Sequence, residues 1–233
     1  MANQEALFTN GRIGNVVFYR INGKGYARTA PGKYKLSKAT KQSAKDFGHI
    51  AQLSKILRKS LSPTLPNYSN RETMYKMSAA LRKWLQGENS IDESIAVEKP
   101  EFNDKSIFTE RFKKELLVDF DTKGKVIISV PRLNIPDDID APSNTLYIRM
   151  DIAVAGCMLE NPAPTDAACT SIKIIYKDGW KDSIQTELKF KYKAGSINVV
   201  AVSLHYIIKK DGPEQEIFDD RWTPATIVAA VMV

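Results

Sequence analysis

The sequence predicts an α+β chain with a basic β-hairpin arm (residues 1–36), a helical pair (37–87) and an antiparallel immunoglobulin-like β-sandwich (88–233). Three patterns indicate this order. Two β-prone segments flank a turn-forming dipeptide near the start, apolar residues then recur at helical spacing, and from about residue 88 apolar and polar residues alternate. The length of 233 residues is enough to bury a sizeable core.

The arm is predicted from residues 16–21 and 24–29, which are rich in β-branched and aromatic side chains. Asn22 and Gly23 lie between them and accept the positive φ angles of a type I′ turn, so the two segments form a hairpin. A two-stranded hairpin is marginally stable in water on its own. We therefore expect the arm to pack against its own C-terminal domain or against a neighbouring molecule.

Two helices follow the arm. The first is capped at Thr40 or a nearby residue and continues through Ser60, with an apolar side that includes Phe47 and Leu57. A breaker at residues 62–67 ends it. Asn70 caps the second helix, which has an apolar stripe typical of core packing, formed by Met74, Met77, Leu81, Trp84 and Leu85, and which ends at Gly87.

The remaining residues alternate with the period of β-strands. The strand candidates are residues 116–121, 125–130, 145–155, 171–176, 186–192, 197–208 and 225–233. Short strands separated by Gly-containing turns are typical of an antiparallel β-sandwich of immunoglobulin-like size. Because sandwiches serve many purposes, this fold by itself predicts no activity.

The charge is divided unevenly along the chain. Residues 1–86 contain 16 lysines and arginines but only three acidic residues, whereas the rest contains 18 basic and 24 acidic residues, for a net charge of +7 overall. This division is typical of a nucleic-acid-binding arm, or of a chain whose basic part meets the acidic part of another copy. A basic face that is simply solvated is the third interpretation.

Catalytic and metal-binding patterns are not found. Cys157 and Cys169 are too few for a disulfide scaffold, and two histidines are too few for a histidine-rich metal site. Ser203 and His205 share one face of a strand, but a nucleophile also needs a group that orients its base, so a hydrogen-bonded structural histidine is the simpler interpretation. We expect no enzyme activity, no cofactor and no metal.

The expected location follows from similar absences. No segment approaches the roughly 20 apolar residues of a bilayer span. The N-terminus lacks the basic and apolar regions of a secretory signal, so we expect synthesis to end in the cytoplasm. A virion or an extracellular assembly remains open as the final location.

The N-terminal motifs resemble those of a known family. The motifs are Gly11-Arg12-Ile13-Gly14 with Val16 and Val17, then Asn22-Gly23-Lys24 with Tyr26, Arg28 and Pro31, and finally Phe47-Gly48 in the first helix. This pattern over about the first 60 residues resembles an uncharacterised Bacteroidota family, and it is similar to proteins found in phages and phage-like elements. The resemblance implies a structural component more than an enzyme, and it supplies no catalytic residue.

Self-assembly into a homo-oligomer, as a ring or a filament, is the first functional hypothesis. A strand of the arm could pair with the sheet edge of another copy, because main-chain hydrogen bonds and alternate side chains both contribute to such contacts. The residues expected to bind the partner are Arg12, Val17, Tyr19, Arg20, Ile21, Lys24, Tyr26 and Arg28 of the arm, with Ile227 and Val231 of the last strand. The last strand belongs either to its own sandwich or to a neighbour's.

Nucleic-acid binding by the same arm is the alternative. Its basic residues are interleaved with Phe18, Tyr19, Tyr26 and Tyr34, a mixture that neutralises phosphates and stacks on bases. The acidic charge of the predicted sandwich opposes this hypothesis, because it would repel a polyanion. Salt separates the two hypotheses: it weakens phosphate contacts steeply and leaves apolar contacts in place.

Overall fold

The computed structural model describes residues 10–21, 23–32, 35–65, 69–86, 100–121, 124–209 and 212–233. Asn22, Tyr34 and Gly87, which the sequence predictions used, lie outside these ranges. The chain divides into two compact units, residues 1–44 and 45–233. We call the three-stranded sheet of the first unit the arm, and we call the second unit the body.

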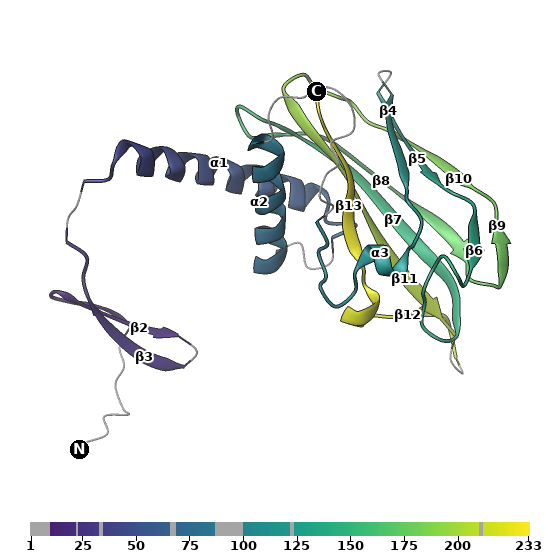
Figure 1. The fold of residues 1–233 in the computed structure, drawn as a ribbon, viewed down its shortest axis with the longest axis horizontal. Coiled ribbons are helices and arrows are strands. Elements are labelled where there is room, and N and C mark those ends of the chain that lie inside the picture. Colours follow the sequence, from purple (N-terminus) through teal and green to yellow (C-terminus); the bar gives the residue numbers. More distant parts are fainter. Residues whose placement is uncertain are drawn as a thin grey trace, which may run out of the picture. The chain divides into compact units, whose positions relative to one another are not determined.

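The arm is an antiparallel sheet in the order β1-β2-β3, formed by Gly11–Ile13, Val16–Ile21 and Lys24–Thr29 (Figure 1). The β2-β3 hairpin has the predicted bounds. Strand β1 was not predicted, because three residues ending before a turn carry no alternating pattern of their own. Gly14 supplies that turn with a φ of +57°. None of the described residues between 10 and 32 is buried.

The two long helices are α1 (Lys38–Ser60) and α2 (Arg71–Gln86). The α1 cap is Ser37, whose Oγ accepts a hydrogen bond from the Thr40 amide at 3.1 Å. Asn70 caps α2 as predicted, since its Oδ1 accepts from the Glu72 amide at 3.2 Å. Phe47, which was expected on the apolar side of α1, is exposed, and the buried side of this helix begins at Ile50.

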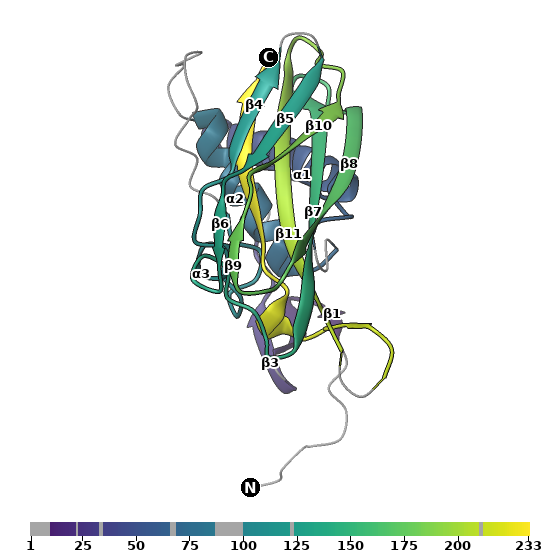
Figure 2. The ribbon, with the colours of Figure 1, turned by 90° about the vertical axis from the view of Figure 1, so that its right-hand side faces the viewer.

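The body contains two main antiparallel sheets (Figures 1 and 2). The larger has the order β12-β11-β7-β8, with β13 also paired to β11; the smaller has the order β10-β5-β4. The strands of the larger sheet are β7 (Thr145–Met158), β8 (Pro164–Ile175), β11 (Ser196–Ile208), β12 (Gln215–Glu216) and β13 (Ala225–Met232). Those of the smaller are β4 (Leu117–Asp121), β5 (Lys125–Val130) and β10 (Ile184–Lys189).

Short elements complete the body. Strands β6 (Leu133–Ile135) and β9 (Gly179–Lys181) pair with each other. The helix α3 (Phe108–Arg111) precedes β4, and the 3-10 turn η1 (Asp220–Trp222) precedes β13. These elements were not predicted, because segments of two to four residues are too short to show a periodic pattern.

Two hydrophobic cores lie on opposite faces of the larger sheet. The first, the sheet core, is enclosed by the two sheets and includes Ile128 of β5, Met150 of β7 and Val202 of β11. The second, the helix core, joins Leu57 of α1 and Leu81 of α2 to the outer face of the same sheet. Figure 2 shows the resulting order of smaller sheet, larger sheet and helices from front to back. The helical pair therefore shares its core with the sheet.

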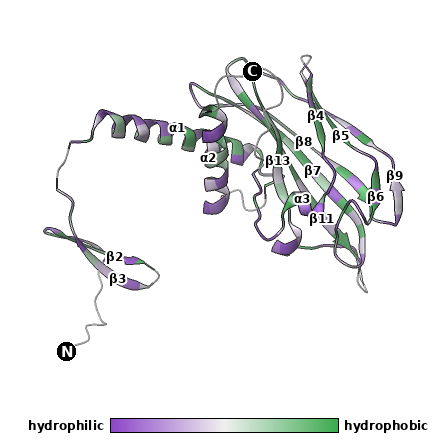
Figure 3. Cartoon of the chain, viewed as in Figure 1, coloured by the Kyte–Doolittle hydropathy of each residue, from purple (hydrophilic) through white to green (hydrophobic). Residues whose placement is uncertain are grey.

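The alternation along β7 explains how one strand serves both cores. Its larger side chains, such as Ile148 and Ile152, point into the sheet core, whereas Ala153 and Ala155 point into the helix core. Small side chains on the helix-facing side let the helices approach the sheet closely. In Figure 3, hydrophobic and hydrophilic bands alternate along α1.

The position of Gly156 yields a first prediction. A Cβ atom there would lie 2.6 Å from Asn198 Oδ1 and 3.1 Å from Cζ of Phe190, and closer still to Thr165 Oγ1. We expect Gly156→Ala to lower the free energy of unfolding by about 1–3 kcal/mol in urea titrations, because the core cannot admit the extra methyl group. Gly48→Ala is the matched control: it lies exposed in α1 with no atom within 4 Å of the added Cβ, so it should stabilise by about 0.5–1 kcal/mol. Equal effects of the two substitutions would contradict this packing.

The two cysteines yield a second prediction. Cys157 is buried in the helix core, and burial raises the pKa of its thiol to about 11, whereas Cys169 is exposed on β8. Since the thiolate is the reactive form, we expect one fast-reacting thiol per folded chain in a DTNB titration at pH 8. Cys169→Ser should abolish the fast phase, and denaturant should release Cys157. A fast phase that survives in Cys169→Ser would show that the helix core is open.

Candidate assembly interface

The strand registers of the arm place most of the predicted partner-binding residues on one face. Arg12 lies opposite Val17 and Val17 opposite Arg28, while Tyr19 faces Tyr26 and Ile21 faces Lys24. Directly opposed residues in antiparallel strands point to the same side of the sheet, and successive residues alternate. We call this side the cationic face, and it comprises Arg12, Val17, Tyr19, Ile21, Lys24, Tyr26 and Arg28.

Aromatic and cationic side chains contact one another on the cationic face. The Tyr19 and Tyr26 rings are stacked, with centroids 5.6 Å apart and planes inclined by 21°. Cζ of Arg28 lies 5.7 Å from the centroid of the Tyr19 ring, within the range of a cation–π contact. Arg12 Nε donates to the carbonyl oxygen of Gly14 at 2.9 Å. This face therefore presents positive charge together with a pair of stacked rings.

The opposite side of the arm is apolar except for Arg20 and Thr29, and we call it the apolar face. It comprises Gly11, Ile13, Val16, Phe18, Arg20, Gly25, Ala27 and Thr29. Ile13 is 65% exposed and Val16 is 38% exposed. Arg20 and Arg28 were both predicted to bind the partner, and the register places them on opposite faces. Among the described residues, the arm thus has a largely apolar face on which Ile13 and Val16 are exposed.

Sequence reasoning expected Val17, Tyr19 and Ile21, one of the two alternating sets of β2, to bind the partner, and these residues lie on the cationic face. It also missed β1, which adds Ile13 to the other set. The available signal was the pair Ile13 and Val16 on either side of Gly14 and Asn15, where a tight turn brings the two residues opposite each other. Recognising that turn would have predicted a three-stranded sheet with one apolar side.

The net charge belongs to the unit that contains the arm. Residues 1–44 hold eight lysines and arginines and one acidic residue, whereas residues 45–233 hold 26 basic and 26 acidic residues. The body is therefore formally neutral, because the basic helices belong to the same unit as the acidic strands. The strands alone remain acidic, as the sequence indicated, and the helices that pack on them bring the charge of the whole body to zero.

The last strand lies within its own sheet. Strand β13 pairs antiparallel with β11 over Ile197 to Ser203. Ile227 is fully buried in the helix core and Val231 is half-buried opposite Asn198. Ile227 is thus corrected as a partner-binding residue, because its side chain offers no surface to a second molecule.

His205 has a polar partner at each ring nitrogen. Its Nδ1 lies 2.7 Å from Glu216 Oε1 and its Nε2 lies 3.1 Å from Ser203 Oγ. This order resembles a nucleophile, base and orienting acid. Ser203 is however only 2% exposed, so a substrate has no access to its hydroxyl.

The surroundings of His205 give this network a structural role. Asp151 Oδ2 is 3.3 Å from His205 Nε2, and Arg149 contacts both Asp151 at 3.1 Å and Glu216 at 3.2 Å. Two carboxylates and one guanidinium therefore surround the ring. Since Glu216 belongs to β12 and the others to β7 and β11, the network holds β12 against the larger sheet.

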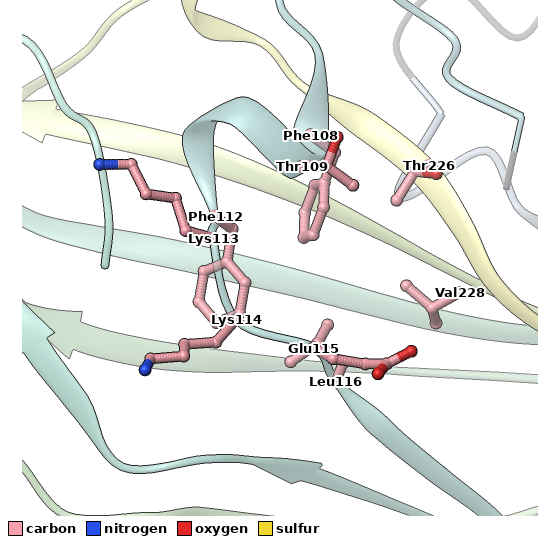
Figure 4. A pocket seen from close by; sticks show the side chains of 9 residues that line it. All are labelled: Phe108, Thr109, Phe112, Lys113, Lys114, Glu115, Leu116, Thr226 and Val228. Atoms are coloured by element: carbon pink, nitrogen blue, oxygen red, sulfur yellow. The ribbon is translucent and has the colours of Figure 1, made fainter. Parts of the chain in front are cut away.

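A hollow of about 160 Å³ lies where α3 meets β13 (Figure 4). It is lined by Phe108, Thr109, Phe112, Lys113, Lys114, Glu115, Leu116, Thr226 and Val228. The Phe108 and Phe112 rings form an apolar wall with centroids 5.8 Å apart, and the two lysine side chains extend away from it. The volume is below the roughly 300–1,000 Å³ of ordinary small-molecule sites. Among the described residues, no group of three or more His, Cys, Asp or Glu side chains is placed to hold a metal ion.

Comparisons with known proteins add little to this geometry. Within the described part of the chain, no helix is both long enough and apolar enough to cross a bilayer. No protein-family model and no curated protein matches the sequence. A solved structure described as "CC2D1B coordinates ESRCT-III activity during the mitotic reformation of the nuclear envelope" aligns with 84% of this chain and 90% of its own. The identity is 7% and the TM-score is 0.24, and these values are too low to show a shared fold.

Proposed function

We propose that the protein is a non-enzymatic structural subunit that assembles with copies of itself through the arm, as a component of a phage-like particle, filament or scaffold. The observation that carries the proposal is the exposed apolar face of a three-stranded sheet in which no described residue is buried. A sheet of this size needs hydrophobic backing to be stable. A second copy of the same chain would supply that backing.

The size of the arm limits how much one contact can contribute. Strands lie about 4.8 Å apart, β2 and β3 are about 20 Å long and β1 is about 10 Å long, so each face presents on the order of 240 Å². Two such faces in contact bury roughly 500 Å², less than the 1,200–2,000 Å² or so of a stable specific interface. The arm contact is therefore weak as a single pair and gains strength when it is repeated in an assembly.

The immunoglobulin-like character of the body belongs to the same proposal. Two antiparallel sheets that enclose one core support it, and the helix core on the outer face is an addition to such a sandwich. A subunit of this kind would be synthesised in the cytoplasm and would end in a virion, scaffold or surface assembly.

The self-assembly proposal predicts the effect of charges on the apolar face. We expect Ile13→Asp combined with Val16→Asp to raise the concentration needed for higher-order species at least tenfold in sedimentation velocity, because the carboxylates would be desolvated in the contact. Leu117→Asp is the matched control: Leu117 is a 65% exposed apolar residue on β4 of the body.

The control should assemble like the wild type, and the thermal unfolding of the body should be unchanged in all variants. A wild type that remains monomeric at every concentration, or an arm variant that assembles like the control, would refute the role of the apolar face.

Binding of single-stranded nucleic acid by the cationic face is the second candidate function. Two observations favour it: the stacked Tyr19 and Tyr26 rings beside Arg28, and the location of the entire net charge in the unit that holds the arm. A neutral body does not repel a polyanion. Stacked rings and arginines are the combination on which bases of any sequence can pack.

The register supplies a matched test of nucleic-acid binding. We expect Arg12→Gln with Arg28→Gln to weaken binding of a 20-nucleotide oligo-dT and to reduce the salt dependence of affinity by about 0.7 for each phosphate that the variant no longer neutralises. Arg20→Gln, on the opposite face, should leave both quantities unchanged. Fluorescence anisotropy between 50 and 200 mM salt measures them. Equal losses for Arg20→Gln and the double variant would show unspecific attraction to the arm, and no binding by the wild type at 50 mM salt would remove this candidate.

A further inference from the structure

Strand β13 is an edge strand of the larger sheet, and among the described residues its outer side is paired only near its start. There the Phe102 amide donates to the carbonyl oxygen of Ala225 at 2.9 Å, and Glu101 and Thr226 form an isolated antiparallel β-bridge through their main chains. Beyond Thr226, no strand of the described residues pairs with this outer side. The exposed edge of β13 runs from Val228 to Met232.

The main chain of this exposed edge has donors and acceptors that point outward. Val233 faces β11, since its amide donates to Ser196 at 3.0 Å and its carbonyl oxygen accepts from Gly195 at 2.6 Å. The direction of backbone groups alternates along an antiparallel strand. The amides and carbonyls of Ala230 and Met232 therefore point away from β11, and within the described ranges no hydrogen-bond partner faces them.

The exposed edge lacks the usual protection against strand pairing. Natural edge strands carry charged side chains, prolines or bulges that prevent edge-to-edge contact. Residues 225–233 contain no charged side chain and no proline. The one bulge lies at Val228, and the register from Ala229 to Met232 is regular again. This last stretch is thus suited to accept another strand.

The side chains of the exposed edge complement themselves in size. A two-fold axis through Val231 would pair Ala230 with Met232 of the partner subunit, and Ala229 with Val233 of the partner subunit. Met232 is 41% exposed and Val233 is 50% exposed, so each large exposed side chain would lie beside a small one. Four main-chain hydrogen bonds, formed by Ala230 and Met232 of both copies, would join the edges.

The distribution of charge favours β13 of a second copy, rather than a strand of the arm, as the strand that pairs with the exposed edge. Strand β3 of the arm carries Lys24 and Arg28, whereas residues 225–233 carry no charged side chain. A basic strand on this edge would place its charges beside uncharged side chains and partly desolvate them, which costs free energy, whereas an uncharged strand has no such cost. We infer that β13 of a second copy pairs antiparallel with β13 across a two-fold axis and joins two larger sheets into one.

This second contact is independent of the arm and gives the proposed assembly its geometry. A two-fold contact through β13 closes as a dimer. Each dimer then presents two arms, and the weak arm contacts link dimers into extended species. One chain therefore has one contact for pairing and another for propagation.

Proline at an outward-facing position tests the inference directly. Met232→Pro removes an amide that points away from β11, a position at which an edge strand tolerates proline, whereas Met232→Leu keeps the amide and a similar side chain. In the Ile13→Asp, Val16→Asp background, which removes arm contacts, we expect dimers by sedimentation velocity. Adding Met232→Pro should raise the dimer dissociation constant at least tenfold, and adding Met232→Leu should leave it within about twofold.

A cysteine at the two-fold axis provides a second measurement that does not depend on the stability of the proline variant. The axis places Val231 opposite itself at a non-hydrogen-bonded position, where Cα atoms are about 4.5 Å apart and a disulfide can form. In a Cys169→Ser background, Val231→Cys should give a covalent dimer on non-reducing electrophoresis. Leu117→Cys, on β4, should give none.

The outcomes distinguish this inference from the proposed function. Monomers in the arm-variant background, together with no covalent dimer from Val231→Cys, would overturn the β13 contact and leave arm-mediated assembly standing. Full-size assemblies that survive the arm substitutions but dissociate with Met232→Pro would support the β13 contact and overturn the role of the arm. Equal effects of Met232→Pro and Met232→Leu would show that the side chain, not the main chain, is responsible, and would also overturn the inference.

Discussion

An exposed apolar face on a small β-sheet is the feature on which the proposed assembly depends. The arm has three strands, an apolar face with exposed Ile13 and Val16, and no buried residue among those described. Water is a poor solvent for that face, and burial of each such side chain contributes about 1.5–3 kcal/mol. A small sheet of this kind gains stability when its apolar face is covered, and we propose that association with a further copy provides that cover.

The body covers the apolar faces of its larger sheet with its own elements. Its larger sheet is covered on one face by the smaller sheet and on the other by α1 and α2, so each of the strands β7 and β11 is buried on both sides. Among the described edge strands β4, β8, β10 and β13 of the body, β13 is the one without a charged side chain. Over the residues that the structure describes, the protein therefore presents an exposed apolar face on the arm and unpaired backbone groups on the body, and we propose that strands or sheets of further copies meet both.

Local signals in the sequence predicted the elements well, and long-range pairing limited the rest. The Asn22-Gly23 turn defined β2 and β3, and Asn70 defined the start of α2, because these signals act between neighbours. Alternation within β2 and β3 sets the two faces of the arm, and the part that Ile13 adds depends on the register of β1, which a three-residue strand does not reveal. The charge of the folded units also differs from the charge along the sequence, since the basic helices pack on the acidic strands and make the body neutral. Glu216 joins His205 only through the pairing of β12 with β11.

Hydrogen exchange at two protein concentrations tests the central claim most directly. If another copy provides the backing of the arm, the amides of residues 16–29 should exchange rapidly in dilute protein and slowly at concentrations where assemblies form. The amides of β11, buried in both cores of the body, should be protected equally at both concentrations. Protection of the arm that is strong in a monomer and independent of concentration would contradict the account, because it would place the backing within the same chain.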